Sequence, residues 1–281
     1  MKLNLRKIKY NISHRFPVLR IPKRVLYAMS YYNKKYIQIL KWGINSKENA
    51  NYTYDLTEAN ILYLAQTISV VTQVDSKKII EYINEARNNK MLKEHIISET
   101  MKSPLKEYAD VRVDFGRRLG WYAFARVLKP KIIVETGVDK GIGSVLLCSA
   151  LLKNKEDGFD GFFFGTDINP EAGYLLNGIY SEVGKILYGD SIKTLSQLNE
   201  KIDLFINDSD HSADYEYREY VTIKDKIAEN AVILGDNSHV TDKLAIFSNE
   251  TKRQFLFFRE EPSGHWYPGA GIGISFNGIK K

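Results

Sequence analysis

Apolar and polar positions change their spacing about 110 residues into the chain. Before that point apolar residues recur at helical intervals, and no run has the spacing of a strand. The acid and glutamate of Asp55-Leu-Thr-Glu58 predict an N-cap at Asp55, and Asp75 predicts a second one. The helices predicted in this part cover Leu26–Trp42, Glu58 to about Val71, Ser76–Asn88 and about 90–101.

From residue 114 onward the pattern predicts an α/β fold. A helix is expected over Arg117–Leu128, and short apolar runs then alternate with segments that have room for helices. Such alternation predicts a doubly wound, mostly parallel sheet of seven strands with helices on both faces. The last two runs are joined by a loop rich in Gly and Pro, so we expect the last strand to be antiparallel. The runs are Lys131–Thr136, Gly161–Asp167, Lys185–Tyr188, Asp203–Asn207, Ala231–Gly235, Gln254–Phe258 and Gly271–Phe276.

Charge is distributed unevenly and divides the chain. Residues 1–47 hold twelve Lys or Arg and no Asp or Glu, whereas the rest holds 28 basic and 34 acidic residues, so the net charge of +6 comes from this segment. We therefore predict a basic N-terminal arm or helix over 1–47, broken at Pro17 and Pro22, then a helical region over 48–110 and the α/β domain over 111–281.

The basic arm suggests an anionic partner. An anionic membrane surface or an acidic glycan would suit it, and the alternative is a solvated helix on the acidic remainder of the chain. Nucleic acid is not expected, because the α/β domain is acidic and carries no nucleic-acid-binding motif.

Bulk composition indicates a globular protein without disulfides. Hydrophobic residues make up 44% of the 281 and charged residues 26%. The single cysteine, Cys148, lies in an apolar run and is expected in the core, which suits a reducing cytoplasm. No apolar run is long enough to span a membrane, and the N-terminus lacks the apolar core of a signal peptide. We expect a cytoplasmic protein, with peripheral attachment at the inner membrane surface through the arm left open.

Three successive predicted strands end in residues that suit a nucleoside cofactor. The first runs into Glu135-Thr-Gly137-Val-Asp-Lys-Gly141-Ile-Gly143-Ser144, the second ends in Asp167, and the third is followed by Asp190-Ser191. Glycines allow a sharp turn close to a ligand, and the helix that follows offers free N–H groups. An acid after the second strand can accept both ribose hydroxyls. The glycine-rich turn alone would also suit a dinucleotide, but the spacing G-x-G-x-x-G is absent.

These motifs, in this order, resemble the class I methyltransferases that depend on S-adenosylmethionine (SAM). The resemblance covers about 110–281 and implies a Rossmann-like methyltransferase fold with SAM as the cofactor. It places the cofactor among Glu135, Gly137, Gly141, Ser144, Asp167, Asp190, Ser191 and Asp208.

The fourth and fifth predicted strands end in residues that suit a hard cation. Asp208 follows one strand and the pair Asp236-Asn237 follows the next, and such oxygen ligands suit Mg²⁺. The arrangement resembles the metal-dependent O-methyltransferases of the catechol and macrocin type. It implies Mg²⁺ on Asp208, Asp236 and Asn237, with Asp208 and His211 as catalytic residues and His211 as the general base. Both acids could instead be ordinary loop caps.

Further aromatic and imidazole side chains are expected near the acceptor. His265, Trp266 and Tyr267 follow the sixth predicted strand and could stack on a sugar or an aromatic ring, or could equally cover the sheet edge. His239 is a candidate acceptor contact. The expected reaction is methyl transfer to a hydroxyl of a small molecule or a sugar or glycan. A metal-independent methyltransferase and a nicotinamide-dependent oxidoreductase remain alternatives. The acceptor and the oligomeric state, a homo-oligomer included, stay open.

Overall fold

The computed structural model describes residues 17–48, 52–210, 212–236 and 238–278. It divides into two compact units. The N-terminal unit comprises Met1–Ser46 together with Gly264–Tyr267, and the sheet unit comprises Lys47–Ser263 together with Pro268–Lys281.

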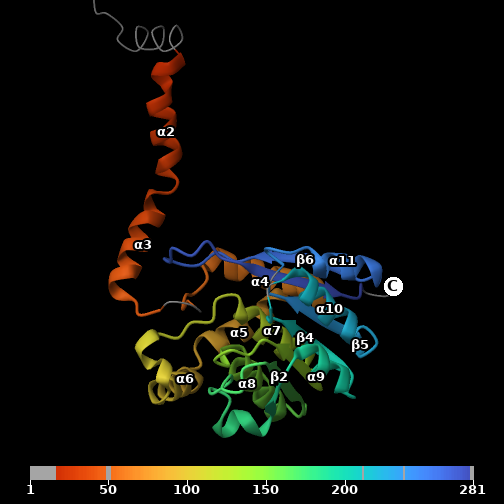
Figure 1. Ribbon diagram of the computed structural model, residues 1–281. Helices are drawn as coiled ribbons and strands as arrows, with labels where there is room; N and C mark the ends of the chain where they lie inside the picture. The colour runs from red at the N-terminus through yellow and green to blue at the C-terminus, as the bar shows by residue number, and fades with distance from the viewer. Residues whose placement is uncertain (1–16, 49–51, 211, 237, 279–281) are drawn as a thin grey trace, which may run out of the picture. The chain divides into compact units, whose positions relative to one another are not determined.

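The sheet unit is built on one sheet that is flanked by helices (Figure 1). The sheet has seven strands in the order β3-β2-β1-β4-β5-β7-β6. Strands β1 to β5 pair in parallel, and β7 lies antiparallel between β5 and β6. The predicted fold class and the antiparallel last strand are therefore confirmed. The strands are β1 Ile132–Thr136, β2 Phe162–Asp167, β3 Gly184–Tyr188, β4 Ile202–Asn207, β5 Ile227–Gly235, β6 Gln254–Arg259 and β7 Gly271–Phe276.

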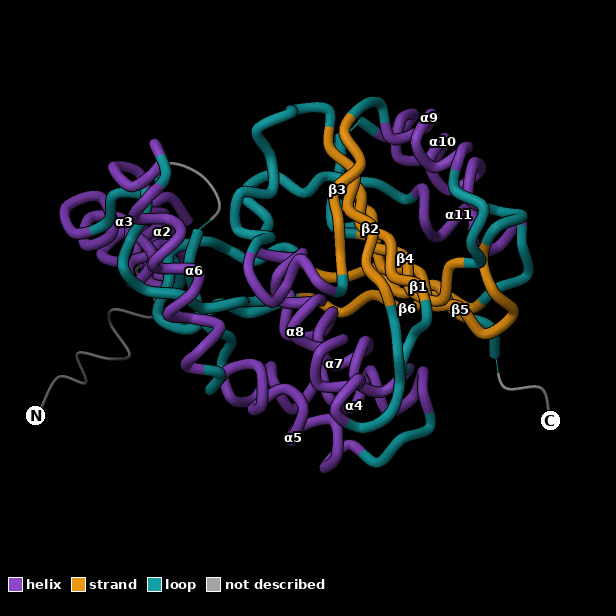
Figure 2. The backbone as a smooth tube through the Cα atoms, turned by 90° about the horizontal axis from the view of Figure 1, so that it is seen from below, coloured by secondary structure: helices purple, strands orange, loops and turns teal. Residues whose placement is uncertain are grey.

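Helices cover both faces of the sheet, because its central strands are apolar on both sides (Figure 2). One face carries α4 Glu58–Thr72, α5 Ser76–Arg87, α7 Arg118–Leu128 and α8 Ile142–Glu156. The other carries α9 Ser191–Gln197, α10 Ala213–Ile223 and α11 Lys243–Glu250, whose apolar side chains form a cluster with Phe205 and Ile233. Cys148 is buried in α8. The remaining elements of this unit are α6 Lys90–Lys102, η2 Pro104–Tyr108 and η3 Gly178–Glu182.

The helical region before the sheet is part of the same compact unit. Helices α4 and α5 pack against each other and against α7, and α6 packs against α8. Leu64 and Ile68 of α4 and Ile79 and Ile83 of α5 are fully buried. Burying one such side chain stabilises the fold by about 1.5–3 kcal/mol, so this region contributes to the core.

Two local expectations were wrong. Thr57, not Asp55, caps α4, because the Thr57 hydroxyl accepts from the Asn60 N–H at 3.3 Å. The Asp55 carboxylate instead forms an ion pair with Arg87 at 2.6 Å. The connection between β2 and β3 contains only turns and η3 where a crossover helix was expected. The cap at Asp75 is confirmed by its bond from the Lys77 N–H at 2.8 Å.

The described part of the N-terminal unit consists of a 3₁₀ turn, two α-helices and the loop 264–267. After the single turn η1 Pro17–Arg20, α2 Ile21–Ser30 and α3 Asn33–Asn45 follow each other, and Pro22 lies in the first turn of α2, where proline is tolerated. Lys35 Nζ donates to the carbonyl oxygens of His265 at 2.9 Å and Tyr267 at 3.4 Å. The ring centroids of Trp42 and Trp266 lie 5.2 Å apart. These contacts fasten α3 to residues 264–267.

Candidate active site

A cavity of about 620 Å³ opens at the carboxyl ends of the parallel strands. Gly137 lines it after β1, Asp167 ends β2, Asp190 follows β3, and Asp208 and Asp236 follow β4 and β5. Glu135 and Ser191 also line the cavity, whereas Gly141 and Ser144 are not among the residues that line it. Ligands of open α/β sheets bind at this edge. The structure therefore brings together the residues that the sequence assigned to the cofactor and to the carboxylate pair.

The turn after β1 requires glycine for two reasons. Gly137 has a φ of +79°, and a Cβ atom there would lie 2.0 Å from the carbonyl oxygen of Asp208. The loops after β1 and β4 therefore touch through backbone. Gly141, with a φ of +96°, is the N-cap of α8 and has no side chain to accept from the first-turn N–H groups. Those N–H groups remain available to an anionic or carbonyl ligand.

Asp167 joins the second strand to this turn. One carboxylate oxygen accepts from the N–H groups of Val138 at 3.0 Å and Asp139 at 2.9 Å. The other accepts from the Asn169 N–H at 2.8 Å. The carboxylate is thereby held at the mouth of the cavity and lines it.

Glu135 is buried beneath the turn. The Ser144 hydroxyl donates to its Oε2 at 2.7 Å, and a Cβ atom on Gly143 would lie 2.1 Å from its Oε1. Burial raises the pKa of Glu135 to about 8, although the bond from Ser144 and the charge of Arg118 oppose this. A neutral carboxyl group is therefore favoured at neutral pH.

Glu219 of α10 joins the ends of three strands, a role that the sequence analysis missed. Its carboxylate accepts from the side chains of Thr136 at 3.2 Å and Ser209 at 2.6 Å, and from those of Asn207 and Ser191. Burial raises the pKa of Glu219 and these four donors lower it. The Ser191 hydroxyl is thus engaged within the protein. Asp190 caps α9 through the Lys193 N–H at 3.0 Å and accepts from the Tyr215 hydroxyl at 3.1 Å.

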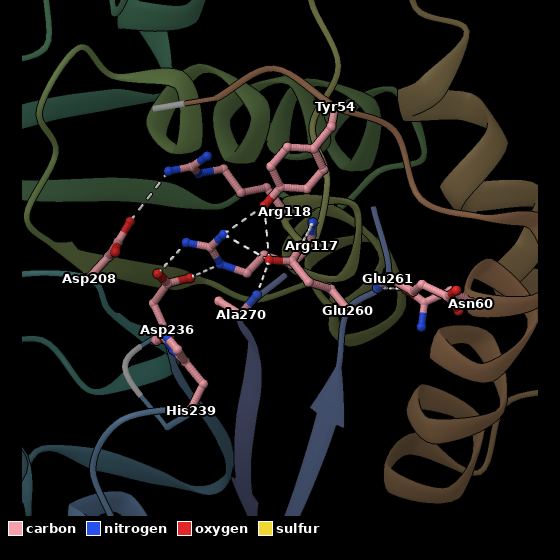
Figure 3. Close-up of polar contacts among 10 residues, drawn as sticks. All are labelled: Tyr54, Asn60, Arg117, Arg118, Asp208, Asp236, His239, Glu260, Glu261 and Ala270. Carbon is pink, nitrogen blue, oxygen red and sulfur yellow. Dashed lines mark hydrogen bonds and ion pairs between the residues drawn. The ribbon is translucent and has the colours of Figure 1, made fainter. Parts of the chain in front are cut away.

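Two consecutive arginines at the start of α7 pair with the two acids that were expected to bind metal (Figure 3). Arg117 donates through Nε and Nη2 to the two carboxylate oxygens of Asp236. Arg118 Nη2 lies 3.6 Å from Asp208 Oδ2. The sequence analysis assigned no role to either arginine.

Arg117 also contacts a second buried acid, Glu260, which follows β6 (Figure 3). Its Nη1 donates to Glu260 Oε1 at 3.2 Å and to the Tyr54 hydroxyl at 3.1 Å. The Tyr54 hydroxyl and the Ala270 N–H donate to the same Glu260 oxygen at 2.9 and 2.6 Å. One guanidinium group therefore bridges the carboxylates of Asp236 and Glu260, which are both buried.

The two cavity acids have pKa values that are shifted in opposite directions. Burial raises the pKa of Asp208 well above its usual range, and the neighbouring Asp236 charge raises it further. Burial alone would also raise the pKa of Asp236, but the Arg117 guanidinium lowers it to about 2. Asp236 is therefore the more acidic member of the pair, and Asp208 is the member with the higher affinity for a proton.

The described residues do not fit a divalent cation well. Both carboxylate oxygens of Asp236 are engaged by Arg117, and the positive charge of Arg118 lies beside Asp208. Within the described ranges no three His, Cys, Asp or Glu side chains gather as a metal site. Two of the expected participants, Asn237 and His211, lie outside the described residues.

The residues predicted to contact the acceptor lie in two places. His239 follows β5, and its Nδ1 lies 3.1 Å from the Asp236 carbonyl oxygen (Figure 3). His265, Trp266 and Tyr267 belong to the N-terminal unit, where Trp266 contacts Trp42 and the His265 carbonyl accepts from Lys35. Their role at an acceptor stays a prediction.

The fold and the cavity together define a class of protein. A doubly wound sheet with an antiparallel β7, a glycine-rich turn after β1 and an acid at the end of β2 is typical of class I methyltransferases. Residues 134–238 match the family model described as "Methyltransferase domain". These residues therefore form a methyltransferase domain, and the expected enzyme class is confirmed. None of the curated proteins compared with the chain matches it.

Several solved structures are similar to this chain at low identity. The O-methyltransferase TomG from Streptomyces achromogenes is 13% identical, with 66% of this chain and 90% of that chain covered and a TM-score of 0.48. The Podospora anserina methyltransferase PaMTH1 is 18% identical, with 72% and 95% covered and a TM-score of 0.48. An O-methyltransferase from Bacillus cereus is 12% identical, with 76% and 100% covered and a TM-score of 0.48.

Proposed function

We propose that the protein transfers a methyl group from SAM to a hydroxyl oxygen of a small molecule, a sugar or a glycan. The observation that carries this proposal is the cavity of about 620 Å³, which is lined by Gly137, Asp167 and Asp190 within a methyltransferase domain. Its volume lies in the range of pockets that hold a ligand of nucleoside size.

The residues around the cavity suit the parts of SAM. The uncapped N–H groups at the start of α8 suit the carboxylate of its methionine part. The Asp167 carboxylate suits the ribose diol, and Asp190 lies where the adenine edge is expected. When bound, SAM supplies an electrophilic methyl group on a sulfonium. The protein then has to align the acceptor oxygen with that methyl group and remove the hydroxyl proton.

Two groups are candidates for accepting the proton. His211, the predicted general base, lies outside the described residues. Asp208 lines the cavity, and its raised pKa makes it a better proton acceptor than an ordinary carboxylate. Arg118, at 3.6 Å from Asp208, would stabilise the charge on that carboxylate before the proton is accepted.

The contacts of Asp236 favour the metal-independent alternative. The expected Mg²⁺ would be held by Asp208, Asp236 and Asn237 and would polarise the acceptor oxygen. Arg117 already neutralises Asp236 through two bonds, and a cation would have to displace a guanidinium that is also bonded to Glu260. Magnesium binding therefore stays a prediction, and the ion pairs of Arg117 and Arg118 support a metal-independent methyltransferase.

Calorimetry and a transfer assay test the proposal. The full chain is titrated with SAM and, separately, with NAD. It is then incubated with isotopically labelled SAM and a set of nucleotide sugars, phenols and glycosides. Binding of SAM together with label in an ether linkage is the expected result. Binding of NAD without SAM would support the oxidoreductase alternative, and label on nitrogen or carbon would contradict the choice of hydroxyl.

A further inference from the structure

The two helices of the N-terminal unit expose an apolar surface that none of the unit's described residues, 17–46 and 264–267, covers. No residue of α2 or α3 is buried. Exposed patches of this kind on a globular protein mark contact sites. The exposed apolar side chains are Ile21, Val25, Leu26, Tyr27 and Met29 on α2, and Tyr36, Ile37, Ile39, Leu40 and Ile44 on α3.

Three apolar residues of α3, Ile37, Leu40 and Ile44, lie opposite its fastened face. Lys35 and Trp42 attach α3 to residues 264–267. Ile37, Leu40 and Ile44 follow one another at helical spacings of three and four and so form one stripe. Leu40 is 66% exposed and Ile44 is 81% exposed. Because one face is fixed within the unit, the stripe has a defined direction away from it.

Charge selects the partner of this surface. Lys23, Arg24, Lys34 and Lys41 are exposed on the same two helices. The first 47 residues hold no Asp or Glu. A second copy of the same surface would therefore meet like charge without an acid to pair with, which disfavours self-association through it.

The length of the helices determines whether they can span a membrane or only lie in its interface. At about 1.5 Å per residue, the 13 residues of α3 extend about 20 Å, whereas a bilayer core is about 30 Å thick. No helix in the described part of the chain is long and apolar enough to cross a membrane. Short helices with an apolar stripe and basic flanks lie in the plane of the membrane interface, with tyrosines at the headgroup level.

We infer that α2 and α3 form an interfacial anchor that binds an anionic lipid surface, with the apolar stripe inserted and Lys23, Arg24, Lys34 and Lys41 among the headgroups. This inference is independent of the proposed reaction, because it rests only on residues 20–46 and 264–267.

Vesicle flotation of the full-length chain tests the anchor. The vesicles contain phosphatidylcholine alone or phosphatidylcholine with phosphatidylglycerol, at low and at high salt. Binding should require phosphatidylglycerol and should weaken as salt rises. The triple substitution Ile37→Ser, Leu40→Ser and Ile44→Ser should reduce binding by about tenfold or more. Lys23→Gln with Arg24→Gln and Lys34→Gln should weaken the preference for phosphatidylglycerol, because three of the twelve basic residues of this segment are lost.

A matched control variant distinguishes binding through α2 and α3 from non-specific hydrophobic binding elsewhere on the protein. Leu62→Ser with Val70→Ser and Val221→Ser removes three exposed apolar side chains from α4 and α10 of the sheet unit. These variants should bind vesicles like the unchanged chain. All substituted apolar residues are exposed, so the unfolding midpoints should stay close to that of the unchanged protein.

A single-site label reports which face inserts. The one native cysteine, Cys148, is buried, so an introduced cysteine can be labelled selectively. A polarity-sensitive dye on Leu40→Cys should shift to the blue on phosphatidylglycerol vesicles, whereas the same dye on Lys34→Cys should shift much less.

Three results would overturn the inference. The first is no flotation at low salt. The second is equal loss of binding in the α4 and α10 control. The third is a chain that does not bind vesicles but binds heparin or forms a dimer, with that binding lost in the stripe variant. Heparin binding would assign the surface to an acidic glycan, and dimer formation would assign it to a second copy of the chain.

Discussion

Arg117 neutralises Asp236 by a two-point contact, although 119 positions separate them in the sequence. The same guanidinium reaches Glu260 at 3.2 Å, so one cation holds the ends of β5 and β6 beside the start of α7. Removing one partner of a buried ion pair leaves an uncompensated charge and costs about 3–5 kcal/mol.

We therefore expect Arg117→Met to destabilise the protein by about 3–5 kcal/mol and to raise the pKa of Asp236 from about 2. Denaturant unfolding of the SAM-free protein measures the first effect. The double variant Arg117→Met with Asp236→Asn should recover part of the loss, because it also removes the buried Asp236 charge that the single variant leaves uncompensated. A loss below about 0.5 kcal/mol, the range of ordinary surface substitutions, would contradict the buried pair.

Chelation tests whether the arginines take the place of a metal. If they do, turnover with an identified acceptor should be unchanged by EDTA, and added Mg²⁺ should have no effect. Loss of turnover in EDTA, with recovery on Mg²⁺ and unchanged SAM affinity, would instead confirm the magnesium site predicted on Asp208, Asp236 and Asn237.

Asp167→Ala should weaken SAM binding by about ten- to 150-fold, which corresponds to the loss of about 1.5–3 kcal/mol from a charged hydrogen-bond acceptor. The variant also frees the N–H groups of Val138 and Asp139. Calorimetry measures the affinity. Asp160→Ala, which removes an exposed acid outside the cavity lining, is the control and should bind SAM normally.

We expect Glu135 to make the free energy of unfolding depend on pH. Its pKa is about 8 in the folded protein against an ordinary value of 4.5, so the folded state binds the proton more tightly. Its contribution to stability is complete below about pH 4.5 and is lost as pH rises through about 8, with a slope of up to about 1.4 kcal/mol per pH unit. Glu135→Gln should flatten this part of the profile. The exposed Glu182→Gln should leave it unchanged, and identical profiles for both variants would refute the assignment.

Glu219→Gln should lower both stability and SAM affinity. An amide cannot accept from all four donors, and each buried donor left unsatisfied costs about 1–3 kcal/mol. Tyr215→Phe removes one bond to Ser191 and one to Asp190 at the rim of the same network, and should have a smaller effect. Equal effects of the two variants would show that Glu219 does not organise the strand ends.

The strands could be predicted because their signal is local. Runs such as Phe162–Asp167 open with consecutive apolar residues, which indicates burial on both faces, and end in glycine or acid at the edge where ligands bind. The antiparallel β7 could be predicted from the short connection before it. Gly137, Asp167 and Asp190 could be placed at the cavity for the same reason, since each lies at the carboxyl end of a strand or within two residues of it.

Partners of buried charges could not be predicted in this way. Arg117 and Arg118 read as ordinary residues at a helix start, and only the tertiary fold places them on Asp236 and Asp208. Glu219 lies in a charged, tyrosine-rich helix segment that reads as solvated, yet it is fully buried. The two arginines lie 119 and 90 positions from the acids with which they pair, and apolar periodicity carries no information about such pairing.

The four residues Gly264–Tyr267, which leave the sheet unit between β6 and β7 and join the N-terminal unit, affect how the protein can be dissected. A shortened chain that begins after Ser46 would keep Trp266 but lose Trp42, its ring partner, and Lys35, which bonds the His265 and Tyr267 carbonyls. Such a truncation would leave half of a small aromatic interface bare, and its aggregation or altered kinetics would say little about α2 and α3 themselves. Point substitutions on the outer stripe of α3 keep that interface intact and are the cleaner way to separate attachment from catalysis.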